Sequence, residues 1–295
     1  MPELPDLTVY VEALNARLQD SEFLGITLAS PFLLRTVTPR VDEFVGRKLL
    51  RCERLAKQLV FVFEGDFFLV IHLMISGRLQ FSEQYKPPNK RNGLATFRFS
   101  TGCVSFTEAS KKKRASMRLV QGLAGLATLN PGGLEVLQVN EAQFVQRLRS
   151  VNHTLKRALT DQHIFAGIGN AYSDEILLRA RLSPFKQSMH ISDEEAGDLY
   201  AACQSVLQEW ILRLRKQANR KFPTKVTAFH SEMAVHGKYK LPCMVCGAPI
   251  QRIVYAENEA NYCSKCQTQG RLLADRSLSR LLKGNWPKRL EDLES

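Results

Sequence analysis

Four of the seven cysteines fall into two closely spaced pairs, Cys243-x2-Cys246 and Cys263-x2-Cys266. Two such pairs, separated by sixteen residues, have the spacing of a tetrahedral structural zinc site. Four thiolates complete the coordination of one zinc ion, so we expect a metal that stabilises the fold and takes no part in catalysis. The alternative, four unrelated free cysteines, is disfavoured by this spacing.

The N-terminal residues Pro2 and Glu3 are a second candidate for chemistry. If Met1 is removed, Pro2 presents a secondary α-amine with a pKa of about 7.7–8.0, so that a fraction of it is a free nucleophile at neutral pH. Its attack on the C1′ atom of a sugar would give an iminium, which acidifies C2′ and permits β-elimination. The Glu3 carboxyl group, next in sequence, can transfer protons in such a reaction. From these residues alone, the alternative that a small second residue has no role stays open.

The turn Gly167-Ile168-Gly169-Asn170 leads into a helical pattern over residues 171–181. Glycines before a helix allow backbone N–H groups to approach a phosphate, and the helix N-terminus supplies partial positive charge. We expect Asn170 to cap the helix and to reach a phosphate. A tight interhelical turn with an asparagine cap explains the same residues.

Charge favours an acidic partner. The chain of 295 residues has 41 lysines and arginines against 29 aspartates and glutamates, a formal net charge of +12. The basic residues gather over residues 213–240 and at Lys111, Lys112, Lys113 and Arg114. This distribution indicates nucleic-acid binding, although a solvated basic surface would look the same.

The expected cellular compartment is inferred from the absence of membrane-span and signal-peptide patterns in the sequence. No run of 18 apolar residues is present, and the N-terminus has no signal-peptide pattern, so we expect neither a membrane span nor secretion. The remaining cysteines, Cys52, Cys103 and Cys203, are scattered, which favours a reducing compartment. We therefore expect a cytoplasmic protein, associated with the nucleoid if the chain is bacterial.

The elements that must position these residues differ along the chain. Apolar residues at helical spacing predict a helix over residues 7–19, with residues 4–6 leading into it. Dense apolar runs over residues 25–120 are typical of strands, with a hairpin turn at residues 64–66. From residue 131 onward the pattern is helical, with capping boxes beginning at Asn140 and Ser192. The expected domains are a β-sandwich (1–130), a helical domain (131–222), a zinc hairpin (223–270) and a basic tail (271–295).

Five motifs in this order resemble the formamidopyrimidine-DNA glycosylase/endonuclease VIII family of base-excision repair enzymes. They are MPELPD (1–6), LAKQLVFVF (55–63), HLMISGRL (72–79), HTLKRALTDQHIFAGIGNAYSDEILLRARLSP (153–184) and the cysteine pairs. The resemblance covers about residues 2–267. It implies an α+β multidomain fold with an N-terminal β-sandwich and flanking helices, a helix-two-turn-helix domain and a C-terminal zinc-finger β-hairpin.

The resemblance also implies an activity, that of a bifunctional DNA glycosylase/AP lyase. Pro2 would form a Schiff base with the sugar of an oxidised nucleotide flipped out of the duplex, and β-elimination would nick the strand, with δ-elimination left open. Glu3 would assist, and Lys57 carries over as the catalytic lysine. Lys156 and Asn170 carry over as phosphate contacts. The implied partner is double-stranded DNA with a damaged base or an abasic site, bound by a monomer that holds one zinc ion.

The chain departs from the family pattern at three places. Ile75, with Met74 one position earlier, stands where a methionine commonly fills the space left by the flipped base. The basic run 111–114 replaces the Arg-Arg-Phe that probes the opposite base, and Asn258 replaces an arginine of the zinc hairpin. We expect Met74, Ile75 and the basic run to contact DNA.

Two rival interpretations remain. A damage- or abasic-site-binding homologue with reduced or no glycosylase turnover would keep the same scaffold. A zinc-ribbon RNA-binding protein explains the charge and the cysteines but not the N-terminal motif. The lesion is not specified, although the short segment 217–237 favours oxidised pyrimidines or abasic sites.

Overall fold

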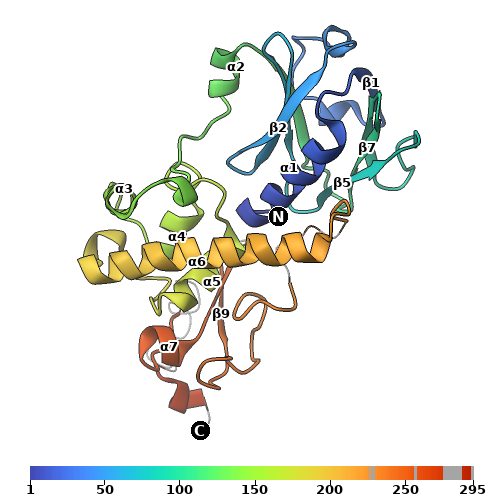
Figure 1. Ribbon diagram of the computed structural model, residues 1–295. Coiled ribbons are helices and arrows are strands. Elements are labelled where there is room, and N and C mark those ends of the chain that lie inside the picture. Colours follow the sequence, from blue (N-terminus) through green and yellow to red (C-terminus); the bar gives the residue numbers. More distant parts are fainter. Residues whose placement is uncertain (225, 227–229, 256–257, 275–287, 294–295) are drawn as a thin grey trace. The chain divides into compact units, whose positions relative to one another are not determined.

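The computed structural model describes residues 1–224, 226, 230–255, 258–274 and 288–293 (Figure 1). Its contacts divide the chain into two units. The first unit is Met1–Pro131 with Glu209–Ala228, and the second is Gly132–Gln208 with Phe229–Ser295. Within the described residues, no helix has the length and apolar character needed to cross a membrane.

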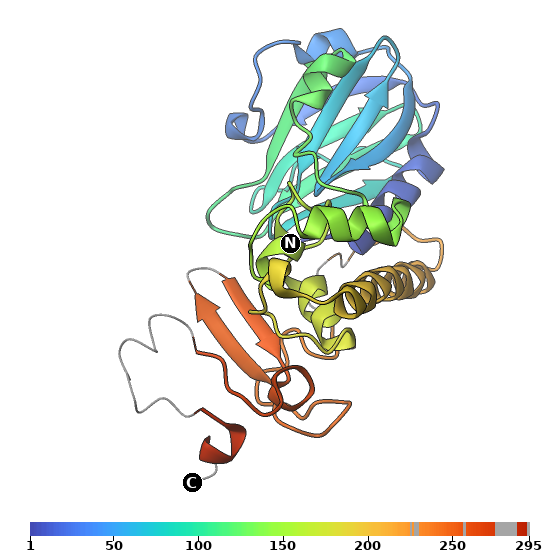
Figure 2. The same ribbon diagram turned by 90° about the vertical axis from the view of Figure 1, so that its left-hand side faces the viewer.

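Two four-stranded antiparallel sheets form the described part of the first unit, with strand orders β1-β6-β7-β5 and β2-β3-β4-β8 (Figure 2). The predicted turn at residues 64–66 joins β3 to β4. The pairing of these two strands begins at Phe63 with Phe67, next to the turn, and ends at Gln58 with His72. This is the sandwich that the sequence predicted. The strands are β1 (Phe23–Leu28), β2 (Leu49–Leu55), β3 (Gln58–Phe63), β4 (Phe67–His72), β5 (Gly77–Ser82), β6 (Gly93–Phe99), β7 (Gly102–Glu108) and β8 (Ser116–Gln121).

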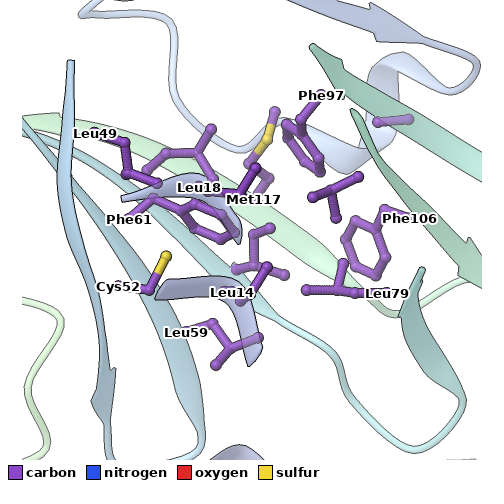
Figure 3. Close-up of a cluster of buried hydrophobic side chains, with 14 of the residues drawn as sticks. Leu14, Leu18, Leu49, Cys52, Leu59, Phe61, Leu79, Phe97, Phe106 and Met117 are labelled. Atoms are coloured by element: carbon purple, nitrogen blue, oxygen red, sulfur yellow. The ribbon is translucent and has the colours of Figure 1, made fainter. Parts of the chain in front are cut away.

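The core of the first unit lies between the two sheets and one helix, α1 (Leu4–Leu18). Figure 3 shows Phe61 of β3, Phe97 of β6 and Phe106 of β7 pointing toward one another, with Leu14 of α1 among them. The opposite face of β3 is covered as well. There Val60 and Val62 pack in a cluster with Leu126 of α2 (Leu123–Ala127) and Leu129, which follows this helix. Burial on both faces explains the continuous apolar run of this strand.

Helix α1 begins three residues earlier than the expected start at residue 7. A proline in the first helical turn costs no intrahelical hydrogen bond, because the first N–H groups of a helix have no partner within it. Pro5 occupies such a position. The Asp6 carboxylate also accepts a hydrogen bond from the Glu3 N–H at 2.9 Å, which fixes the start of the helix.

The second unit contains further helices and the zinc hairpin. Both predicted capping boxes form: Asn140 accepts from the Gln143 N–H (2.9 Å), and Ser192 accepts from the Glu195 N–H (3.2 Å). The last of its long helices, α6, continues into the residues counted with the first unit. The helices are α3 (Glu141–Leu148), α4 (Leu155–Thr160), α5 (Asn170–Arg179), α6 (Asp193–Ala218) and α7 (Ser264–Thr268).

An antiparallel hairpin of β9 (Gln251–Tyr255) and β10 (Asn258–Tyr262) lies between the two cysteine pairs. Strand β10 packs on α5. The described part of the tail returns to this region: the Leu272 N–H donates to the Lys288 carbonyl (2.9 Å), and the Leu290 N–H donates to the Gly270 carbonyl (3.1 Å).

Phe63 tests the sandwich core. Its fully buried ring meets Phe23 and Phe44 edge-on at centroid distances of 5.4 and 5.5 Å. Phe63→Ala should lower the free energy of unfolding of the first unit by about 3–5 kcal/mol, because it leaves a cavity. Phe32, 78% exposed, supplies the control: Phe32→Ala should change it by less than about 0.5 kcal/mol. Hydrogen exchange of the β3 and β4 amides as a function of urea measures both, and equal effects would contradict the assigned core.

Candidate active site and metal centre

The first turn of α1 holds the N-terminal residues inside the first unit. Pro2 and Glu3 are buried, Glu3 to 2% exposure. The backbone of Glu3 is fixed from both sides, because its N–H donates to Asp6 and its carbonyl accepts from the Leu7 N–H at 2.9 Å. The two sequence-predicted residues therefore sit on a rigid, buried start of a helix.

The α-amine in this structure belongs to Met1, and the Pro2 nitrogen is an amide. Burial lowers the pKa of this amine below its usual value; the negative charge of Glu3 opposes the shift, while the positive charges of Arg78 and Lys57 add to it. Both predicted partners, Glu3 and Lys57, thus act electrostatically on the same N-terminal group. Removal of Met1 would transfer the amine to the next residue, Pro2.

Lys57 lies in the tight turn between β2 and β3. Its neighbour Ala56 has a positive φ of 51°, and the Ala56 carbonyl accepts a hydrogen bond from Arg54 Nη1 at 2.8 Å. The Lys57 side chain is directed inward, with 7% of the residue exposed. Burial lowers the pKa of His72 to about 4, and the positive charges of Lys57 and Arg118 contribute to this shift.

The loop after β4 carries Met74 and Ile75. Neutral His72 holds it, because His72 Nδ1 accepts from the Met74 N–H at 3.1 Å. The loop closes where the Gly77 N–H donates to the Leu73 carbonyl at 2.9 Å; a Cβ atom on Gly77 would lie 2.2 Å from that oxygen, so only glycine fits. Ile75 is left 56% exposed on this turn.

The basic run 111–114 forms the connection between β7 and β8. Its base is fixed by buried Glu108, whose carboxylate accepts from the Arg114 and Ala115 N–H groups at 3.1 and 3.2 Å. Lys113 donates to the Glu108 carbonyl, and Lys111 and Lys112 are exposed. The Ser110 N–H donates to Ser76 Oγ at 3.1 Å, so the basic loop and the Ile75 loop lie side by side.

A cavity of about 410 Å³ opens beside the first turns of α1. Asp6 and Val9 form one side of it, and residues at the end of α6 and in the segment after it form the rest. Asp6 is the residue that binds the Glu3 N–H. The cavity is therefore linked directly to the N-terminal turn.

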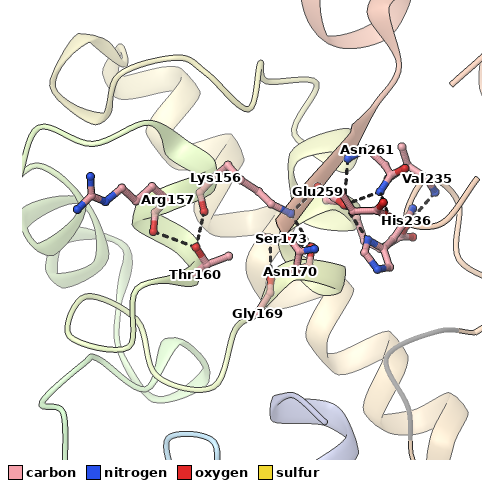
Figure 4. A network of polar contacts seen from close by, with 12 residues as sticks. Lys156, Arg157, Thr160, Gly169, Asn170, Ser173, Val235, His236, Glu259 and Asn261 are labelled. Carbon is pink, nitrogen blue, oxygen red and sulfur yellow. Dashed lines mark hydrogen bonds and ion pairs between the residues drawn. The ribbon is translucent and has the colours of Figure 1, made fainter. Parts of the chain in front are cut away.

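In the second unit, Lys156 and Asn170 come together although fourteen residues separate them. The Lys156 ammonium donates to the Asn170 carbonyl at 2.6 Å and to Asp174 Oδ1 at 2.5 Å, as Figure 4 shows. The expectation that Asn170 caps α5 was wrong: Gly169 is the N-cap, and Asn170 is the first helical residue. The N-terminus of α5 nevertheless lies beside a buried lysine.

Sequence reasoning missed the acids of α5. Asp174 binds Lys156, and Glu175 accepts backbone N–H groups from Ala234 (2.8 Å), Val235 (2.9 Å) and His236 (2.9 Å). Both acids are buried. The available signal was their position between the apolar residues Tyr172 and Ile176, since an acid on a buried helical face needs partners.

The four predicted cysteines form one metal centre, with their sulfur atoms all within 4.8 Å of one another. Four thiolates at about 2.3 Å from a zinc ion lie roughly 3.8 Å apart, so the residues fit tetrahedral zinc. Gly247, with a φ of +75°, closes the first pair by donating to the Cys243 carbonyl at 2.9 Å. Cys243 and Cys263 also pack in a small core with Leu178 of α5. The zinc therefore holds the hairpin and has no open coordination position for catalysis.

Three family models match the chain in sequence order. The N-terminal domain of formamidopyrimidine-DNA glycosylase matches residues 1–114, the helix-two-turn-helix domain of the same enzymes matches 133–220, and a zinc finger found in these glycosylases and in isoleucyl-tRNA synthetases matches 240–269.

Curated relatives and solved structures agree. The formamidopyrimidine-DNA glycosylase of Thermus thermophilus is 33% identical over 281 residues, 92% of this chain and 100% of that protein. That of Desulforamulus reducens is 30% identical over 90% of this chain and 99% of its own length. MutM bound to DNA with carbocyclic 8-oxo-G superposes with a TM-score of 0.79 at 26% identity, covering 90% of this chain and 100% of that one. The Lactococcus lactis enzyme bound to abasic-site DNA gives 0.79 at 25% identity, covering 90% and 99%. The chain belongs to the formamidopyrimidine-DNA glycosylase family, a family of DNA glycosylases with AP lyase activity.

Proposed function

We propose that this chain removes a damaged base from double-stranded DNA and nicks the strand at the abasic site, with Pro2 as the nucleophile after Met1 is removed. The observation that carries the proposal is the buried, fixed start of α1, where Pro2 and Glu3 are buried and the Glu3 N–H donates to Asp6. Burial, with Lys57, lowers the pKa of the amine that Met1 carries at this place, and a free Pro2 amine would stand one residue away. A lowered pKa leaves more of the amine neutral at pH 7, and only the neutral amine is a nucleophile.

The reaction needs four steps. The Pro2 nitrogen bonds to C1′ as the bond from C1′ to the base breaks, and the N–H proton of Pro2 passes to the departing base. The sugar ring then opens at C1′–O4′, Glu3 protonates O4′, and the nitrogen lone pair forms the iminium. The Glu3 carboxylate then accepts a C2′ proton as the 3′ phosphate is expelled, and water hydrolyses the C=N bond, which frees the Pro2 amine and leaves an aldehyde on the product. Further δ-elimination stays open, because the Asn258 side chain lies outside the described residues.

The remaining predicted residues serve to hold DNA. In this proposal Lys57 contacts the phosphate beside the lesion, Ile75 and Met74 occupy the space that the flipped base leaves, and the basic loop 111–114 contacts the backbone. Lys156 and Asn170 contact phosphate from the second unit. We place the extruded base in the cavity beside Asp6.

We further propose domains at 1–130, 131–222 and 223–270 with a tail at 271–295, and a monomer that works on the DNA of the cytoplasm or nucleoid. The names of the relatives refer to formamidopyrimidine, and DNA in the related structures carries 8-oxo-G, Fapy-dG or an abasic site. We propose a lesion of this oxidised or abasic class. The preference for pyrimidines drawn from segment 217–237 stays a prediction, because that segment includes residues outside the described ones.

The nucleophile is tested by trapping. Borohydride reduction should link the chain with a free Pro2 amine to a duplex containing an abasic site. The same chain with an N-terminal tag should give less than about 1% of the adduct, because its nitrogen is an amide and covalent catalysis is lost. Glu3→Gln should slow base excision by about 10²-fold or more, the usual contribution of a proton-transfer group. An equal yield of adduct from the tagged chain would contradict the assignment of Pro2.

The second test uses pH. His72 has a folded-state pKa of about 4, below the ordinary value of about 6.5. As the pH falls from 7 toward 4, the unfolded chain therefore takes up a proton that the folded chain does not, and the first unit should lose about 3 kcal/mol of stability. His72→Gln should remove this part of the dependence. Parallel pH profiles of the two proteins, measured by urea unfolding, would contradict the environment of His72.

The third test removes the metal. Chelation should expose the amides of residues 243–267 to hydrogen exchange and abolish duplex binding, because zinc contributes about 10–16 kcal/mol in zinc-finger peptides. The amides of β3 and β4 are the internal control and should stay protected. A hairpin that stays protected after complete loss of zinc would contradict the structural role.

A further inference from the structure

The Asp174 carboxylate binds three separate segments of the second unit. One oxygen, Oδ1, accepts from the Lys156 ammonium at 2.5 Å. The other, Oδ2, pairs with His236 Nδ1 at 2.8 Å and accepts from the Asn261 N–H and Nδ2 at 3.2 and 3.4 Å. Figure 4 shows Lys156 approaching from α4 and Asn261 from β10, on opposite sides of α5. The carboxylate has no exposed surface.

Lys156 depends on this contact. Its side chain is only 3% exposed, and a buried ammonium is costly unless it is paired and hydrogen-bonded. An ammonium has three N–H donors. Asp174 and the Asn170 carbonyl receive two of them. Together they direct the charge of Lys156 to the first turn of α5.

The zinc hairpin depends on the same carboxylate. Asn261 lies two residues before the zinc ligand Cys263, and its Nδ2 also donates to Glu259 Oε1 at 3.0 Å. The bond from the Asn261 backbone N–H fixes β10 against α5 just before the metal centre. Glu175, the next residue of α5, fixes the segment 234–236 in the same way.

We infer that Asp174 is a positioning residue for DNA binding: it holds Lys156 for a phosphate and ties the zinc hairpin to the same site. The inference rests on the proposed phosphate contact of Lys156. A neutral amide could not replace the carboxylate, because Lys156 and Asn261 both present donors to it. An amide has one accepting end, so its NH2 group would face a donor on one side or the other.

The experiment measures how the Kd for a duplex with a stable abasic-site analogue depends on salt. Lys156→Met should weaken binding about tenfold, as expected for a charged hydrogen bond, and should lower the salt slope by about 0.9, the value for one phosphate contact. Asp174→Asn should produce the same change of slope, and the double variant should add nothing further. Asp198→Asn, which makes the same charge change at an exposed residue of α6, is the control and should leave the slope unchanged.

Only chains that hold one zinc ion are compared. If Asp174→Asn loses zinc, Asp174→Glu takes its place, because it keeps the charge but moves the carboxylate away from Lys156, and the same loss of slope is expected. The inference would be overturned if the zinc-loaded Asp174 variant kept the salt slope of the wild-type chain. It would also be overturned if the losses of slope in the two single variants added up in the double variant. Borohydride trapping on the same samples separates the two proposals. A wild-type chain without an adduct contradicts the proposed function, whereas an adduct with an unchanged slope contradicts only the role of Asp174.

Discussion

The proposed chemistry depends on a chain terminus that is held inside a folded unit. Terminal residues are ordinarily poorly ordered, and a mobile amine would meet the sugar only rarely. Here the helix begins at Leu4, so the backbone hydrogen bonds of Glu3 are made within one turn of the N-terminus. Pro5 and Asp6 permit that early start: Pro5 has no N–H group that needs an acceptor, and the Asp6 carboxylate accepts from the Glu3 N–H.

The two units bury charge by different means. Around the N-terminus, burial is the main cause that shifts the Met1 amine and the His72 imidazole toward their neutral forms; the charge of Lys57 adds to both shifts, while Glu3 and Asp6 oppose that of the amine. At α5 the charges are opposite, and Asp174 pairs with Lys156. In the proposed function, the first arrangement favours a neutral amine that reacts, and the second holds Lys156 for a phosphate. Both follow from the cost of an isolated charge away from water.

Much of this could be predicted from the sequence. The cysteine spacing, the turn at residues 64–66 and the capping boxes at Asn140 and Ser192 are local signals, and each appears in the structure. The α5 network could not be predicted, because it joins Lys156, Asp174 and Asn261 from elements up to 105 residues apart. A local sequence pattern does not predict contacts between residues so far apart in the chain. The start of α1 was misplaced for a different reason, since a proline ends a helix when it is internal but is tolerated in the first turn.

In the proposed function, the two neighbouring loops of the first unit have different roles on the DNA. Ile75 is apolar, exposed and set on a turn that requires Gly77, which suits a side chain that fills space between stacked bases. The adjoining loop carries lysines, each a flexible point charge with no planar face and no accepting group. Such side chains suit phosphate, a contact that fixes position and carries no sequence information. In the proposed complex, Ile75 would fill space in the duplex while the lysines hold the backbone, and the Ser110–Ser76 hydrogen bond of 3.1 Å fixes the two loops to each other.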